Sequence, residues 1–369
     1  MAEIKQRSLE EVKALSQEEA VEIMRHAGIL GAGGGGFPTY FKYTDPQPHL
    51  IVNANESEPG YWADKVMHQE YLDEFLHVYE ALKTIFKFEQ VSMCIHEKDE
   101  GWYAAYAEHA GEGAYDIRCV PDKYALGEEK ALIKQITDTK VPRKVETSDG
   151  SERTGTPLDV GIIVNNSETL FNIYRALFLG RPIITKFLSV YGEDVANLKV
   201  YEVPIGASMA EVLSIAGLDV ENSGHLSLID GGPYLNEMGI EELGTEDGYV
   251  RQTTNALLLI PRGTKSKDYA DVETEPPEEG IVSLVGKLSG VRMPLGGRYL
   301  EPAEALVSEG EEVEYEQKIG EPVEKGFSIG VWASTGGTIS SIEDDIVAIE
   351  GGGPSQQEAE AEAEAEAHR

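Results

Sequence analysis

From Gly31 to Lys42 the sequence reads GAGGGGFPTYFK, and this stretch says most about how the first half of the chain folds. Five of its first six residues are glycine, so its backbone can approach a ligand closely and direct several N–H groups toward it. Pro38 suits the first turn of a helix, and Lys42 lies one turn further on, where its charge would favour an anion at the helix N-terminus. The stretch therefore predicts a phosphate-binding loop that leads into a helix. It matches neither the dinucleotide fingerprint nor the P-loop, so a flexible turn would explain the glycine run alone equally well.

A second polar segment, Asn53 to Gly60, reads NANESEPG and directly follows the apolar run from Leu50 to Val52. In an open α/β sheet, ligands lie beyond the carboxyl ends of the strands, and this segment would project there. Its amides offer both donors and acceptors, and its carboxylates accept from hydroxyl or amide groups. A polar turn would explain any one of these side chains by itself.

Two further segments are expected at the same edge of the sheet. The sequence YALGEE, from Tyr124 to Glu129, precedes a helical pattern. The sequence NNSET, from Asn165 to Thr169, follows the run from 161 to 164 and opens a helix expected over 168–179. Asn166 and Ser167 are natural N-caps, so helix capping is the alternative explanation. Four polar junctions along one sheet favour a shared ligand site over four independent caps.

The pattern along the chain predicts an α/β protein of several domains. Short apolar runs alternate with helical stretches over 29–185, which predicts a Rossmann-like domain with a parallel sheet. A helical lead-in, 1–28, precedes it, with capping boxes at Ser8/Glu11 and Ser16/Glu19. Shorter elements over 186–262 predict a β-grasp module, 263–280 a linker, 281–351 a β-sandwich, and 352–369 a disordered acidic tail.

Composition excludes several classes of protein. The net charge is −35, from 66 acidic and 31 basic residues, which argues against nucleic acid and anionic membranes as partners. The run from Ala256 to Ile260 is far too short to span a membrane. Two cysteines, Cys94 and Cys119, are too few for an iron–sulfur cluster, which takes about four. We therefore expect no metal site and no Fe–S cluster in this chain, and a cytoplasmic protein that docks peripherally on a membrane complex.

Taken together, the four segments resemble, in order and spacing, the FMN- and NADH-contacting segments of the complex I flavoprotein subunit and of its relative in Rnf-type electron-transport complexes. The resemblance extends to the later modules: 200–261 is similar to the SLBB β-grasp domain of this family, and 293–351 to the barrel-sandwich hybrid domain of the Rnf relative. That domain comes first in the Rnf relative and last here.

The resemblance implies FMN as the cofactor, NADH or NADPH as the hydride donor, and specific residues for each. The phosphate and ribityl end of FMN would be held by Gly31, Gly33, Gly34 and Lys42. The rest of the flavin pocket would be formed by Asn53, Asn55, Glu56, Tyr124, Gly127, Glu128, Glu129, Val164, Asn165, Asn166 and Thr169. The nicotinamide nucleotide would contact Glu58, Glu128 and Phe37, the last by stacking on adenine. No residue is implied as a catalytic acid or base.

The sequence departs from the family pattern at three places. Ala32 stands where the complex I protein has Arg, and Asn55 stands where it has Asp, so a charge-assisted hydrogen bond is lost on each side of the pocket. The cluster-binding cysteines of both relatives are missing. Flavin electrons would therefore leave to an Fe–S or other redox partner subunit.

These features predict an FMN-dependent electron-transfer subunit that accepts hydride from NAD(P)H. Two alternatives remain open at this point: a flavin relay that never contacts NAD(P)H, and a non-catalytic assembly subunit of a redox complex.

Overall fold

The structure, a computed structural model, describes residues 4–55, 58, 60–110, 113–147, 150–231, 236–239, 248–265 and 274–351. The chain divides into two compact units, each discontinuous in sequence. The first comprises 1–24, 39–58 and 67–180, and the second comprises 25–38, 59–66 and 181–369. The acidic tail, residues 266–273 of the expected linker, and Glu56 lie outside the described residues.

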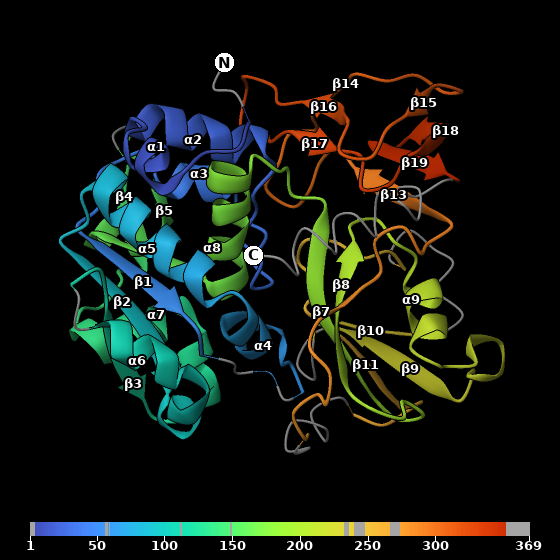
Figure 1. Cartoon of the computed structure of the whole chain (residues 1–369), viewed down its shortest axis with the longest axis horizontal. Helices are drawn as coiled ribbons and strands as arrows, with labels where there is room; N and C mark the ends of the chain where they lie inside the picture. Colours follow the sequence, from blue (N-terminus) through green and yellow to red (C-terminus); the bar gives the residue numbers. More distant parts are fainter. Residues whose placement is uncertain are drawn as a thin grey trace. The chain divides into compact units, whose positions relative to one another are not determined.

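The first unit is built on a parallel four-stranded sheet in the order β3-β2-β1-β6. Figure 1 labels its strands β1, β2 and β3. Its strands are β1 (His49–Asn53), β2 (Gln90–His96), β3 (Asp116–Val120) and β6 (Ile162–Asn166), with a small hairpin of β4 (Lys144–Glu146) and β5 (Glu152–Thr154). All four parallel strands are joined by helical connections, as the alternating pattern predicted. The Rossmann-like α/β architecture is therefore confirmed.

Helices account for most of the remaining chain in the first unit. The α-helices are α1 (Leu9–Lys13), α2 (Gln17–His26, whose last two residues belong to the second unit), α3 (Thr39–Lys42), α4 (Ala63–Glu70, whose first four belong to the second unit), α5 (Leu72–Phe86), α6 (Ala104–Ala110), α7 (Glu129–Thr137) and α8 (Ser167–Tyr174). Shorter helical segments are η1 (Glu97–Tyr103), η2 (Tyr124–Gly127), η3 (Pro157–Val160) and η4 (Arg175–Leu179). The helix expected over 168–179 continues as a π-helical turn from Arg175. The Ser8/Glu11 capping box is formed as predicted.

One face of the sheet packs on α7 through a fully apolar core. Ile51, Cys94 and Val164 from the strands meet Leu132 and Ile133 of α7 in one buried cluster. Burial of this apolar surface fixes the sheet, so the carboxyl ends of its strands are held at defined positions.

The second unit contains a six-stranded mixed sheet in the order β10-β9-β11-β7-β8-β12. Its elements are β7 (Thr185–Gly192), β8 (Lys199–Pro204), α9 (Met209–Ile215), η5 (Val220–Asn222), β9 (Leu226–Asp230), β10 (Asn236–Gly239), β11 (Ala256–Pro261) and β12 (Val282–Ser283). The β7–β8 hairpin is followed by α9, and β11 then pairs parallel to β7. This topology is the β-grasp arrangement expected for the middle of the chain.

Two small antiparallel sheets complete the second unit. One has the order β13-β19-β18-β15 and the other β14-β16-β17. Their strands are β13 (Gly290–Pro294), β14 (Glu304–Ala305), β15 (Glu312–Val313), β16 (Lys318–Glu321), β17 (Val331–Trp332), β18 (Gly337–Glu343) and β19 (Ile346–Glu350). The β-sandwich predicted for the end of the chain is confirmed. No helix in the described part of the chain is long and apolar enough to span a bilayer.

Candidate functional site

Lys42 lies at the end of α3 and is largely buried in the first unit. Its Nζ donates to the backbone oxygen of Val164 over 2.7 Å and to Oε1 of Glu129 over 3.1 Å. The side chain is only 14% exposed. An ammonium group has three N–H donors, so one remains for an anionic ligand once these two bonds are made.

The amides after β1 form a second polar group. Asn53 donates from Nδ2 to the oxygen of Gly127 over 2.9 Å, and its Oδ1 accepts from Nδ2 of Asn55 over 3.0 Å. These bonds connect the carboxyl end of β1 to the end of η2. Asn53 is also the register partner of Asn166 on β6, so the polar ends of both strands lie side by side.

The last two residues of β6 have different partners, and one of them caps the helix that follows. Asn166 is the N-cap of α8, and its Oδ1 accepts from the backbone N–H of Thr169 over 3.0 Å. Asn165 instead points inward and donates from Nδ2 to the hydroxyl of Tyr43 over 2.6 Å. Burial raises the pKa of Tyr43, so this hydroxyl keeps its proton at all physiological pH values.

Glu128 and Glu129 have different roles in the structure. Glu128 caps α7, since its side chain accepts from the N–H of Ala131 over 2.9 Å. Glu129, the first residue of α7, pairs with Lys42. Tyr124 opens η2, three residues before Gly127.

Two buried amide oxygens at this edge accept no hydrogen bond from the described residues. They are Oδ1 of Asn55 and Oδ1 of Asn165, on side chains that are 7% and 2% exposed. A buried acceptor without a donor costs free energy, which a ligand with N–H or O–H donors would recover. The flavin ring N–H and the ribityl hydroxyls are such donors, so the residues present fit FMN.

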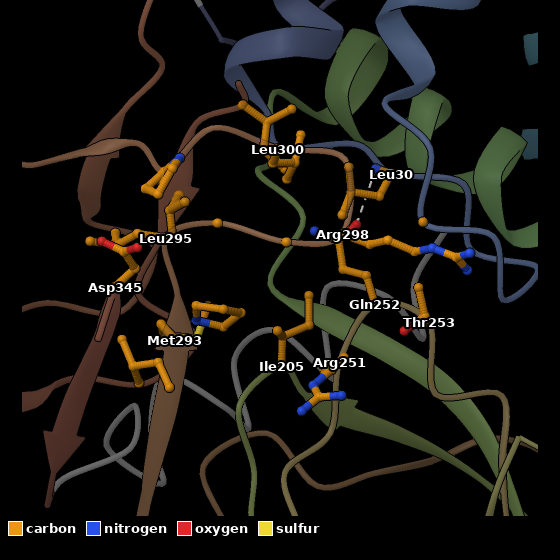
Figure 2. Close-up of a pocket in the computed structure, with 18 of the residues that line it drawn as sticks. Leu30, Ile205, Arg251, Gln252, Thr253, Met293, Leu295, Arg298, Leu300 and Asp345 are labelled. Carbon is orange, nitrogen blue, oxygen red and sulfur yellow. Dashed lines mark hydrogen bonds between the residues drawn. The ribbon is translucent and has the colours of Figure 1, made fainter. Parts of the chain in front are cut away.

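The glycine-rich loop belongs to the second unit. It is closed by a bond from the N–H of Gly31 to the oxygen of Phe37, over 2.9 Å, and by a bridge between Leu30 and Pro38. Gly34 and Gly36 have φ of +87° and +62°, a backbone conformation that side-chain-bearing residues rarely adopt. The loop borders a cavity of about 610 Å³ within this unit (Figure 2).

The ring of Phe37 packs against two other aromatic rings. Its ring lies edge-on to Tyr299 at 5.7 Å and to Phe327 at 5.5 Å between centroids. Both partners come from the β-sandwich. The ring is half-buried, so part of it stays open to a ligand.

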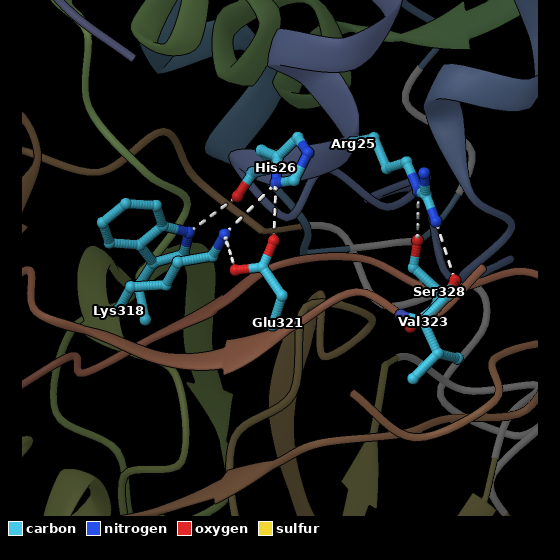
Figure 3. Close-up of polar contacts among 7 residues, drawn as sticks. Arg25, His26, Lys318, Glu321, Val323 and Ser328 are labelled. Atoms are coloured by element: carbon cyan, nitrogen blue, oxygen red, sulfur yellow. Dashed lines mark hydrogen bonds and ion pairs between the residues drawn. The ribbon is translucent and has the colours of Figure 1, made fainter. Parts of the chain in front are cut away.

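The start of the loop is bound by polar contacts to the β-sandwich (Figure 3). Arg25 donates to the backbone oxygens of Val323 over 2.7 Å and Ser328 over 3.3 Å. Lys318 contacts Nδ1 of His26 at 3.2 Å and pairs with Glu321. The last residues of α2, from which the loop departs, are therefore held by the C-terminal module.

Two residues that hold the predicted segments, one in each unit, were not singled out from the sequence. Gln252 donates to the oxygen of Gly28 over 2.8 Å and accepts from the N–H of Leu30 over 3.1 Å, so it holds the chain entering the loop. It is more than 220 positions away in sequence, and no local pattern points to it. Tyr43, the partner of Asn165, directly follows Lys42 in the sequence. Its position next to a predicted site residue could have pointed to it.

The predicted site residues are divided between the two units. In the first unit, Lys42 contacts Val164 and Glu129, and Asn53 contacts Asn55 and Gly127. Gly31, Gly33, Gly34 and Phe37 lie in the second unit. Glu58 belongs to the first unit, and Glu56 lies outside the described residues.

The two cysteines lie on neighbouring strands, β2 and β3. Cys94 is buried and Cys119 is exposed. Burial is the main cause that raises the pKa of both thiols, and Cys94 is affected most. A raised pKa disfavours the thiolate that a metal or cluster requires. Across the described ranges, no three His, Cys, Asp or Glu side chains form a metal-binding group.

Comparison with known proteins places these features in a family context. Residues 24–175 match the Nuo51 FMN-binding domain model, and residues 280–356 match the RnfC barrel sandwich hybrid domain model. The C subunit of an ion-translocating oxidoreductase complex of Haemophilus influenzae is 29% identical over 276 residues, covering 74% of this chain and 38% of that protein. A cobalamin reductase, PduS, of Citrobacter freundii is 30% identical over 267 residues, covering 72% of this chain and 54% of that protein.

A solved structure of similar fold is that of an NAD⁺-reducing [NiFe]-hydrogenase in the H₂-reduced state. It superposes with a TM-score of 0.54 at 22% identity, over 70% of this chain and 49% of that chain. The match to each of these proteins spans less than two thirds of its length. The chain thus contains a segment that matches the Nuo51 FMN-binding domain and, nearer its C-terminus, a segment that matches the RnfC barrel sandwich hybrid domain.

Proposed function

We propose that this chain is an FMN-binding electron-transfer subunit that accepts hydride from NADH or NADPH and passes electrons to a redox partner subunit. The observation that carries the proposal is the pair of buried, unpartnered oxygens of Asn55 and Asn165 at the carboxyl edge of the described sheet. Both belong to the segment matched by the FMN-binding domain model.

In this proposal, FMN supplies the redox chemistry, taking two electrons with the hydride and releasing them to the partner. The protein binds and orients. Lys42 donates its third N–H to the phosphate, and Asn55 and Asn165 accept from the flavin. Tyr43 and Gly127 hold the site amides in place through the bonds described above. The assignments of the glycine-rich loop to the phosphate and of Phe37 to the nicotinamide nucleotide rest on the resemblance of their sequence to the family, and both lie in the second unit.

The proposed reaction requires no residue as an acid or base. Hydride transfer needs the donor carbon and the flavin ring to be held face to face, so the contribution of the protein is proximity and orientation. The remaining site residues, Glu56, Glu58, Tyr124, Glu128 and Thr169, would shape the pocket. We also propose that the chain holds no Fe–S cluster and works in the cytoplasm on a membrane-associated complex.

The proposal is tested by anaerobic absorption spectroscopy of the FMN-loaded protein. Addition of NADH, or of NADPH in a parallel sample, is expected to bleach the flavin band. A bound flavin that stays oxidised with both donors would contradict the hydride step and leave an electron relay, which the Ala32 and Asn55 departures favour. Failure to bind flavin would leave an assembly role.

A further inference from the structure

His96 is a buried side chain to which the proposed function gives no role. It is the last residue of β2 and is fully buried. β2 pairs with β1 on one side and with β3 on the other. Ligands of an open parallel sheet bind beyond the carboxyl ends of its strands. His96 lies at that end, between the chain that leaves β1 at Asn53 and the chain that leaves β3 at Val120.

His96 shares a face of the sheet with Asn53. Side chains alternate between the two faces along a strand. Cys94, two residues before His96, belongs to the apolar cluster that packs against α7, and so does Ile51, two residues before Asn53. Since Asn53 is the register partner of Cys94, His96 lies one side-chain position further toward the carboxyl edge. It is therefore the neighbour, on the next strand, of an amide assigned to the flavin pocket.

The hydrogen bond at Nδ1 fixes which ring nitrogen of His96 carries the proton. Nδ1 lies 3.3 Å from the backbone oxygen of Pro121, and a carbonyl oxygen only accepts, so Nδ1 is the donor. Burial is the main cause that lowers the pKa of His96, although Asp122 and Asp99 act to raise it. Lys98 acts in the same direction as burial. The ring is thus neutral at pH 7, and its Nε2 is an acceptor.

Nε2 of His96 accepts no hydrogen bond from the described residues. A buried acceptor without a donor costs free energy. The same holds for Oδ1 of Asn55, just after β1, and for Oδ1 of Asn165 on β6. Three neighbouring strands, β2, β1 and β6, therefore each bring one unsatisfied acceptor to the carboxyl edge, which favours a single ligand with several donors.

We propose that Nε2 of His96 accepts a hydrogen bond from bound FMN, which makes His96 a further flavin-binding residue. The inference rests on the proposed function, since it requires flavin at this edge. FMN offers its ring N–H and its ribityl hydroxyls as donors, and the histidine exchanges no proton with it. His96 lies outside the four segments that resemble the flavin-contacting segments of the family.

A purely structural role for His96 would use the other ring nitrogen. An imidazole that only held the chain at Pro121 would need Nδ1 alone. The amide of an asparagine side chain lies near the position of Nδ1, whereas that of glutamine reaches the position of Nε2. His96→Asn can therefore keep the bond to Pro121 and lose the acceptor, and His96→Gln does the reverse.

Quenching of FMN fluorescence by the full chain measures the affinity of each variant. His96→Asn is expected to bind FMN about tenfold more weakly, because one hydrogen bond to the ligand is lost. His96→Gln is expected to bind FMN nearly as tightly as the unmodified chain. His77→Asn makes the same replacement at an exposed position on α5 of the same unit, so it is expected to leave the affinity unchanged.

Nitrogen-15 NMR of the unmodified chain, labelled in its histidine rings, gives a second readout. The Nε2 resonance of His96 is identified by its absence from His96→Gln. Addition of FMN is expected to shift it toward the position of a hydrogen-bonded nitrogen. A shift with NAD⁺ but not with FMN would assign the donor to the nicotinamide nucleotide and overturn the flavin contact.

The outcomes separate this inference from the proposed function. If the unmodified chain binds FMN, normal affinity of His96→Asn or an Nε2 resonance that FMN leaves in place would overturn the inference alone. Weak binding by His96→Gln together with normal binding by His96→Asn would assign the ring to Pro121 only. Failure of the unmodified chain to bind FMN would overturn both.

Discussion

At the scale of single residues, the site works through side chains whose partners lie far away in sequence. Lys42 contacts the oxygen of Val164, and Asn165 contacts Tyr43, each across 122 positions. The residue types at these positions were predictable, because strands ending in amides indicate a ligand edge. Their partners were not, because local spacing carries no information about which loops meet in space.

Replacement of Lys42 tests the charge at the proposed phosphate position. Lys42→Ala is expected to weaken FMN binding by roughly 10- to 100-fold, because a charge-assisted hydrogen bond is lost. Flavin fluorescence quenching measures this affinity. Lys140→Ala, at an exposed position of the same unit, is the matched control and should bind FMN like the unmodified chain. Equal affinity of the two variants would remove Lys42 from the site.

His68 provides a pH-dependent test at the same scale. It is buried against Phe75, with ring centroids 3.9 Å apart, and its Nε2 lies 2.9 Å from Oγ of Ser167 at the start of α8. Burial lowers its pKa from 6.5 to about 3. The unfolded chain therefore takes up this proton first, so the stability that neutral His68 provides is complete above pH 6.5 and falls as pH decreases toward 3.

Comparison with a variant that cannot titrate isolates this contribution. As the pH falls from about 6.5 to 5, the free energy of unfolding is expected to fall more steeply for the unmodified chain than for His68→Gln, the difference in slope rising toward about 1.4 kcal/mol per pH unit. His49 and His96, whose pKa values burial also lowers, are present in both proteins. Urea titrations at several pH values measure the slopes, and parallel slopes would refute the assignment.

At the scale of elements, the strands and helices of the α/β sheet follow from the sequence, whereas the position of the loop does not. The runs around Leu50, Val91 and Ile162 form β1, β2 and β6 as expected. The glycine-rich loop, however, groups with the second unit, because Gln252 and the β-sandwich bind its flanks. Such packing between distant segments leaves no periodic pattern in the sequence.

Gly330 tests the attachment of α2 to the β-sandwich. Its N–H donates to the oxygen of Arg25 over 3.0 Å, and an added Cβ would lie 2.1 Å from the oxygen of His26. Gly330→Ala is therefore expected to destabilise the protein by about 1–3 kcal/mol through overpacking. Gly224→Ala, where no atom lies within 4 Å of the added carbon, should change stability little. Denaturant unfolding of both variants measures the difference, and equal stability would show that the backbone adjusts freely there.

At the scale of the whole molecule, charge dominates. A net charge of −35 destabilises the compact state by self-repulsion, which salt screens as the Debye length falls from about 10 Å at 0.1 M to 3 Å at 1 M. Raising NaCl over this range is expected to raise the Tm by several degrees. Thermal unfolding followed by circular dichroism measures it. A Tm that falls with NaCl would mean that favourable ion pairs outweigh the repulsion.

The central claim, that the chain binds FMN through its phosphate as well as its ring, is tested most directly by comparing FMN with riboflavin. Fluorescence quenching of each flavin by the full chain gives the two affinities under identical conditions. FMN is expected to bind about 100-fold more tightly than riboflavin, because only FMN presents a phosphate to Lys42. Equal affinity for both flavins, or binding of neither, would contradict it.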